Sequence, residues 1–253
     1  MLRPLTGVAA LHGVRRTLLW SAAAAVLAAL GASVLLGYGR RLWYPSFVAI
    51  AGGQTHGQVV TRLGPIFRPG LRAAAREAGS RYPPERLWLI GLKQERVLEV
   101  WAPGSKGWRR LRSYPVLAAS GGRGPKLQEG DNQVPEGLYR LTAFNPNSSY
   151  HLSVRVGYPN QDDRAAAAAE GRVHLGGDIY IHGKAVSIGC LAIGDRGIEE
   201  LYVLLADTGL ANSSLVLAPS ARPEAPGDAP RWWRPLYRRI GAALSEVRGS
   251  PPD

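Results

Sequence analysis

The stretch GGDIYIHGKAVSIGCLAIGD, residues 176–195, contains the residue types needed for thiol chemistry. It holds the single cysteine of a 253-residue chain, Cys190, and a histidine, His182, eight positions before it. A cysteine nucleophile needs a base that accepts the thiol proton and N–H donors that stabilise the developing oxyanion. The spacing therefore suggests a Cys190 nucleophile with His182 as its base.

Two glycines flank this pair and could position it. The Gly183 carbonyl can bond to one imidazole nitrogen and so fix the tautomer of His182. Gly189 permits a sharp turn that exposes the sulfur, and the N–H groups of Gly189 and Cys190 are candidate oxyanion donors.

Two other interpretations of the stretch compete with catalysis. One is a metal site with the ligands His174, Asp178, His182 and Cys190. Gly176 and Gly177 would break a helix that gathers these side chains, and a strand would alternate them, so we predict no metal and no other cofactor. The other is a buried cysteine and a strand histidine with structural roles only, which these residues alone leave open.

Composition limits the class of protein. The formal charge of +12 makes nucleic acid the first partner to consider. The arginines are scattered, however, and no helix-turn-helix, zinc-finger or RNP pattern is present, so we expect no nucleic-acid partner and favour a basic surface that faces anionic envelope polymers or lipids. A single cysteine cannot form an internal disulfide.

Residues 17–39, TLLWSAAAAVLAALGASVLLGYG, contain no charged residue. Twenty-three helical residues would extend about 35 Å, enough for a hydrocarbon core of about 30 Å. We favour an uncleaved transmembrane anchor behind a cytoplasmic head, and a cleaved signal peptide is the alternative. Either one exports the rest of the chain to the periplasm.

The elements that must position the site are mostly short strands. Strands are predicted near residues 87–92, at RVLEVWAP, at RRLRSYPVLAAS, near 138–144 and 151–156, at DIYIHG and CLAIGD, and at SLVLAP. Helices are predicted before Gly79, at DDRAAAAAEG, at DRGIEELYVLLADTGL and after residue 231. The fold class is mainly β with a few helices (α+β), preceded by one transmembrane helix.

The boundaries divide the chain into four parts. Residues 1–41 form the head and anchor, 42–61 a linker, 62–218 the catalytic domain, and 219–253 a second linker and a helix. The last helix places Trp233, Leu236, Tyr237, Ile240 and Leu244 along one face. We prefer packing on the sheet to binding a membrane surface for this face.

Several segments in order resemble one family. IHG before SIGC is similar to the signature of the YkuD-type L,D-transpeptidases, which act on peptidoglycan stem peptides. GPKLQEGDNQVPEGLY, FNPNSSYHLSVRVGYPN, IYIHGKAVSIGC and IEELY resemble its YafK-like branch, over about residues 62–217. The resemblance implies a mixed β-sandwich or barrel.

It also implies a Cys190 thioester, His182 as base with Gly183 as its orienting partner, and stem peptides as substrate. The substrate-binding candidates are Lys126, Glu129, Gln133, Tyr150, His151, Tyr180 and Ser187. The sequence departs from the common pattern by a shorter His–Cys spacing, by Ile188 in place of a histidine, and by the loss of an arginine after the cysteine. Lys126, Arg155 or Arg164 could replace that arginine. A non-catalytic wall-binding protein is the alternative function.

Overall fold

The computed structural model describes residues 20–21, 24–34 and 39–249, and the chain separates into two compact units, Met1–Gly52 and Gly53–Asp253. In the first unit, residues 24–34 are helical and α2 spans Arg40–Ala51. No helix within the described ranges combines the length and the apolarity needed to cross a bilayer. The predicted anchor includes residues 17–19, 22–23 and 35–38, which lie outside the described residues, so it stays a prediction.

Helices occupy the region where the sequence predicts a linker. Most of residues 42–61 belong to α2 and to the first turns of α3, which spans His56–Glu77. Thr55 and Gln58 form a capping box at the start of α3, in which each side chain accepts a bond from the other residue's backbone N–H. The helix predicted before Gly79 is therefore present but begins far upstream.

Eight strands form one sheet in the order β3-β2-β1-β8-β4-β5-β6-β7. Their bounds are β1 Leu87–Leu92, β2 Val97–Gly104, β3 Gly107–Pro115, β4 Gly137–Ser148, β5 His151–Val156, β6 Tyr180–His182, β7 Leu191–Ala192 and β8 Ser213–Ala218. The pairs β1–β8 and β6–β7 are parallel, and the other neighbours are antiparallel. The α+β class predicted from the sequence is confirmed.

Strand β4 connects two sections of this sheet. Its first residues, Gly137 to Arg140, pair with β8, and the register then shifts so that its later residues pair with β5. The two edges of the sheet approach each other as well, because Ala118, just after β3, forms an isolated bridge with Ala192 in β7. The sheet therefore curls toward closure, which suits the sandwich or barrel expected from the sequence.

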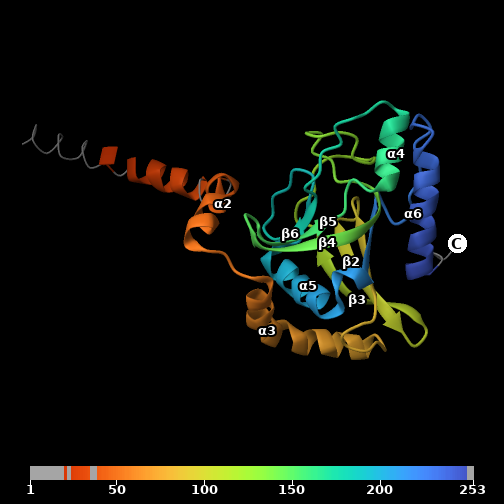
Figure 1. The fold of residues 1–253 in the computed structure, drawn as a ribbon, viewed down its shortest axis with the longest axis horizontal. Helices are drawn as coiled ribbons and strands as arrows, with labels where there is room; N and C mark the ends of the chain where they lie inside the picture. Colours follow the sequence, from red (N-terminus) through yellow and green to blue (C-terminus); the bar gives the residue numbers. More distant parts are fainter. Residues whose placement is uncertain (1–19, 22–23, 35–38, 250–253) are drawn as a thin grey trace, which may run out of the picture. The chain divides into compact units, whose positions relative to one another are not determined.

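Helices cover both faces of the central strands (Figure 1). Leu89 and Leu217 join a core cluster with α3 and with α5, which spans Gly194–Thr208. Ile90 and Val216 alternate to the other face and pack against α6, which spans Trp233–Arg248. The prediction that the last helix packs on the sheet is confirmed. A short helix, α4, spans Gln161–Ala169, and a 3₁₀ turn spans Leu210–Asn212.

A buried carboxylate ties α6 to the long loop that precedes β4. Glu136 is fully buried and accepts hydrogen bonds from Lys93 Nζ at 2.9 Å, from Gly124 N at 3.1 Å and from the Tyr237 hydroxyl. Burial lowers the pKa of Lys93, and the Glu136 charge opposes that shift. This network holds the loop over residues 116–136 in place.

Candidate active site

The short parallel pair β6–β7 places the segments that carry His182 and Cys190 side by side. In its register Ile181 lies opposite Leu191, and His182 lies opposite Ala192. Ile181 and Leu191 point into the core. Because side chains alternate along a strand, His182 points to the opposite face. Cys190 immediately precedes β7, two residues before the partner of His182.

His182 is held in one tautomer by the main chain. Its side chain is buried, and Nδ1 lies 2.6 Å from the Gly183 carbonyl oxygen. A carbonyl can only accept, so Nδ1 carries the proton and Nε2 keeps its lone pair. Burial lowers the pKa of His182, and the bond to Gly183 partly offsets this. The imidazole is therefore a neutral base, and the Tyr150 ring lies 4.8 Å from it between centroids, tilted by 31°.

The turn after His182 leaves no room for a side chain at Gly183. A Cβ there would lie 2.6 Å from Asp195 Oδ1 and 2.8 Å from the Tyr150 carbonyl oxygen. Asp195 fixes the turn by accepting the Lys184 backbone N–H at 2.8 Å and the Lys184 ammonium at 2.6 Å. Asp195 is a supporting residue that the motif alone does not reveal, because it lies thirteen positions from His182.

The thiol of Cys190 is half-buried and protonated at neutral pH. Burial raises its pKa to about 11, the Asp178 charge acts in the same direction, and the Lys126 charge acts against it. Its sulfur lies 3.7 Å from the Asp178 carbonyl oxygen, and among the described residues it makes no hydrogen bond to His182. This is a neutral thiol near a neutral imidazole rather than a preformed thiolate–imidazolium pair.

Ser187 organises the turn that carries the cysteine. Its Oγ accepts from the N–H groups of Gly189 at 3.3 Å and Cys190 at 3.0 Å, and it donates to the Cys190 carbonyl at 2.7 Å. Gly189 has a φ of 115°, a conformation that L side chains rarely adopt. The two expected oxyanion donors are thus present, and the Ser187 hydroxyl occupies them.

The model of the L,D-transpeptidase catalytic domain, YkuD, matches residues 86–213, which include this whole arrangement. The chain belongs to the YkuD family. It is 37% identical over 112 residues to "Putative L,D-transpeptidase YafK" of Escherichia coli strain K12 and of strain O157:H7. That match covers 44% of this chain and 43% of each relative, so the similarity spans less than half of either length.

The chain is also similar in structure to solved proteins. The helical cell shape determining protein Pgp2 of Campylobacter jejuni has a TM-score of 0.47 at 19% identity and covers 74% of this chain and 61% of its own. L,D-transpeptidase 1 of Mycobacterium tuberculosis has a TM-score of 0.30 at 16% identity and covers 52% and 61%.

Two residues expected to bind substrate from the YkuD resemblance are engaged inside their own loop. The Lys126 ammonium is buried and donates to Asp131 Oδ1 at 2.6 Å and to the Gln128 carbonyl at 2.8 Å. The Gln133 amide donates to the Gly124 carbonyl at 2.9 Å and accepts from Gly122 N at 2.8 Å. Both side chains shape the loop, and Lys126 also acts on the thiol through its charge.

The other substrate-binding candidates lie at different places around the thiol. His151 Nε2 lies 2.8 Å from Glu199 on α5, and Glu129 is exposed beside His174 and Arg164 in a pocket of approximately 440 Å³. Tyr180 precedes His182 on β6, and its hydroxyl donates to Asp178 Oδ1 at 3.3 Å. Tyr150 contacts the base directly.

Ile188 is one position where this chain departs from the common YkuD pattern, and Arg155 is a candidate replacement for the lost arginine. Arg155 on β5 lies opposite Tyr180 and pairs with Asp178 Oδ1 at 3.3 Å. Ile188 is exposed on the turn before Cys190. For the metal alternative, the described residues contain no cluster of three or more possible ligands.

Proposed function

We propose that this protein is an exported cysteine-dependent enzyme that acts on peptidoglycan stem peptides. The observation that carries the proposal is the bond from His182 Nδ1 to the Gly183 carbonyl, on a strand that pairs with the one directly after Cys190. This bond leaves Nε2 free to accept a proton. A residue with a purely structural role would not need a buried, neutral imidazole beside the only cysteine.

The reaction begins when substrate displaces the weak contact between the Cys190 sulfur and Asp178. The thiol proton passes to His182 Nε2 as sulfur attacks the carbonyl carbon of an amide bond next to an L-centre. The N–H groups of Gly189 and Cys190 then donate to the oxyanion instead of to Ser187 Oγ. The C–N bond then breaks, and His182 returns the proton to the leaving amine, which leaves a thioester on Cys190.

The thioester is released by water or by an amine, and we favour water. An incoming acceptor stem must be held by the enzyme, whereas hydrolysis needs only a water activated by His182. The apolar Ile188 stands where the common pattern has a histidine. The apolar Leu191 lies in the stretch after the cysteine where that pattern often has an arginine. Fewer polar side chains are thus available to hold an acceptor, and the reaction is cleavage of a cross-link or of a wall–protein link.

Arg155 is the best-placed replacement for the missing arginine. Its guanidinium reaches Asp178, which also accepts from Tyr180 and lies next to the thiol. An arginine there can bind a stem carboxylate in bidentate fashion. Lys126 is committed to Asp131, and Arg164 lies on α4, so neither offers a comparable contact.

Export follows from the uncharged run over residues 17–39, which would place the catalytic domain in the periplasm behind an inner-membrane anchor or after signal cleavage. Peptidoglycan lies in that compartment. The basic surface of the chain suits an anionic wall or membrane.

The test gives the full chain a purified disaccharide-tetrapeptide and cross-linked dimers, with and without excess D-amino acid, and follows the products by mass spectrometry. We expect cleaved product in wild type and none in Cys190→Ala. Exchanged or dimeric product that exceeds hydrolysed product at every acceptor concentration would show a transpeptidase instead. Binding to wall material with no turnover would support the non-catalytic alternative.

A further inference from the structure

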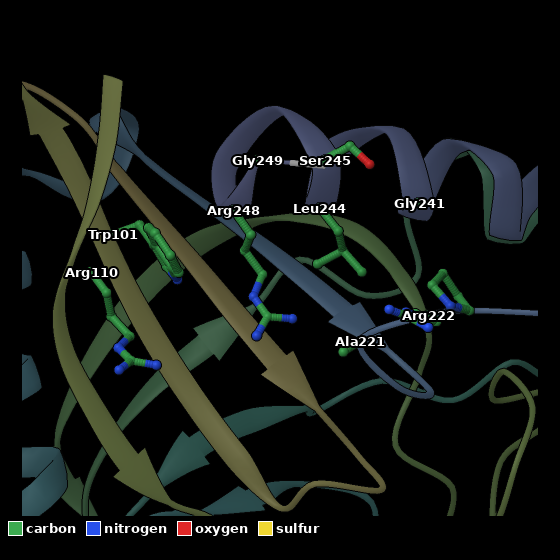
Figure 2. A pocket seen from close by; sticks show the side chains of 10 residues that line it. Trp101, Arg110, Ala221, Arg222, Gly241, Leu244, Ser245, Arg248 and Gly249 are labelled. Atoms are coloured by element: carbon green, nitrogen blue, oxygen red, sulfur yellow. The ribbon is translucent and has the colours of Figure 1, made fainter. Parts of the chain in front are cut away.

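A pocket of approximately 490 Å³ lies between the β2–β3 hairpin and the end of α6 (Figure 2). We call it the arginine pocket, and its lining includes Trp101, Arg110, Arg222, Leu244, Ser245 and Arg248. Three separate parts of the chain supply the guanidinium groups: β3, the segment after β8, and the last turn of α6. Figure 2 shows Arg248 between Arg110 and Arg222, with the Trp101 ring next to Arg110.

A single buried carboxylate holds two of these arginines. Glu99 is buried, and its Oε1 lies 3.2 Å from Arg110 Nη1 while its Oε2 lies 3.3 Å from Arg248 Nε. The Trp101 indole N–H also donates to Glu99, at 3.0 Å. One negative charge between two guanidinium groups leaves an excess of positive charge, and none of the described residues that line the pocket is acidic.

Two of the arginines, Arg110 and Arg248, share one buried partner. Within the described part of the chain, Arg110 and Arg248 each contact Glu99 through one nitrogen, so most of their N–H groups remain available. Side chains held by a buried partner lose less conformational entropy when a ligand binds. This arrangement differs from the scattered, solvated arginines that the sequence predicts for the surface.

The pocket has apolar walls beside its charges. Trp101, Pro223 and Leu244 provide them, and Ser245 adds a hydroxyl. The volume falls within the range of small-molecule sites, about 300–1,000 Å³, and is far larger than a bare inorganic anion requires. The occupant therefore carries an oxyanion together with a ring or another apolar part.

We propose that the arginine pocket binds an organic oxyanion, a carboxylate or a phosphate carried on a ring such as a sugar. Guanidinium groups recognise both oxyanions in bidentate fashion. No lining residue comes from β5, β6 or β7, so this site is separate from Cys190 and His182. The proposal does not depend on the proposed function.

The test titrates the full chain by calorimetry at low ionic strength with three sugars of similar size. N-acetylmuramic acid carries a carboxylate, glucose 6-phosphate a phosphate, and N-acetylglucosamine no charge. We expect at least one anionic sugar to bind and the neutral one not to. Arg110→Gln and Arg248→Gln should each weaken binding about tenfold or more, the effect of losing one charge-assisted contact.

Two further variants make the result specific. Arg109→Gln removes the same charge from the neighbouring exposed position on β3, whose side chain alternates to the other face, and should bind as wild type does. Removing both arginines would strand Glu99 as a buried charge, so Glu99→Gln/Arg110→Gln/Arg248→Gln tests full loss of binding with the fold kept, checked by circular dichroism.

Comparing the titrations with N-acetylmuramic acid and glucose 6-phosphate identifies the preferred oxyanion. Binding of either sugar alone supports the site. The proposal is overturned if neither anion binds wild type at millimolar concentration. It is also overturned if Arg109→Gln weakens binding as much as Arg110→Gln does, because the effect is then one of net charge.

Discussion

At the β6–β7 end of the sheet, residues 178–192 form a corner in which His182 and Cys190 bond to main-chain carbonyls. At the α6 side, the charges around Glu99 are paired with one another. Both regions bury ionisable groups. The corner holds a neutral imidazole and a thiol whose pKa is raised by burial, whereas the arginine pocket holds its carboxylate in ion pairs.

This difference suits the roles that we propose for the two regions. A base and a nucleophile must exchange a proton, so their pKa values have to be set by burial and by dipoles that do not lock them into an ion pair. A binding site for an anion needs permanent charge, which arginine retains even when partly buried. Four experiments, two at the corner and two at buried carboxylates elsewhere, test how burial sets the behaviour of ionisable groups in this fold.

The largest effect is expected from the base itself. His182→Ala removes the proposed base and should lower kcat roughly 10²- to 10⁴-fold. His174→Ala is the matched control, because His174 is exposed on the loop before β6 and should leave kcat unchanged. Equal loss in both variants would contradict the assignment of His182.

The next effect concerns the pH dependence of the thiol. Because burial raises the pKa of Cys190 to about 11, the thiolate fraction should grow about tenfold per pH unit between pH 7 and 10. Iodoacetamide alkylation, followed by mass spectrometry, should rise with the same slope. A plateau below pH 9 would indicate a preformed ion pair and remove the contrast with the arginine pocket.

A third change acts on the buried network that ties α6 to the loop before β4. Tyr237→Phe leaves one oxygen of the fully buried Glu136 without its hydroxyl donor. We expect a loss of about 1–3 kcal/mol in the free energy of unfolding, measured by urea denaturation. In a Glu136→Gln background the same change should cost less, and an equal cost in both backgrounds would rule out the coupling.

The smallest effect comes from Asp163 on α4. Burial raises its pKa to about 6 from 3.8, so the unfolded chain ionises first and stability falls as pH rises between these values. Asp163→Asn should reduce this fall, seen as a smaller decrease in Tm between pH 4 and 7, at roughly 2–4 °C per kcal/mol. Asp162→Asn is the control, because that carboxylate is half-exposed and paired with Arg239. The two variants should differ in pH slope.

Most strands could be predicted from the sequence, since alternation in residues 151–156 and the turn signals around residues 93–95 are local. The start of α3 was missed because Gly57, Gly64, Pro65 and Pro69 interrupt the helical pattern. The Thr55–Gln58 capping pattern was the available signal.

The pair Cys190 and His182 could be predicted because the spacing and the glycines lie in one short stretch. The inward-facing roles of Lys126 and Gln133 could not, because their partners are set by how the loop folds on itself. The arginine pocket could not be predicted from the sequence either, because Glu99, Arg110 and Arg248 meet only when α6 packs on the sheet.

The Gly183 turn has a consequence for how this site tolerates mutation. The atom that orients the base is a main-chain carbonyl, which all twenty amino acids carry, so no substitution can delete it. Yet a Cβ at this position would collide with Asp195 and with the Tyr150 backbone. In a saturation library position 183 should therefore accept only glycine, although its contribution to the chemistry comes from an atom common to every residue.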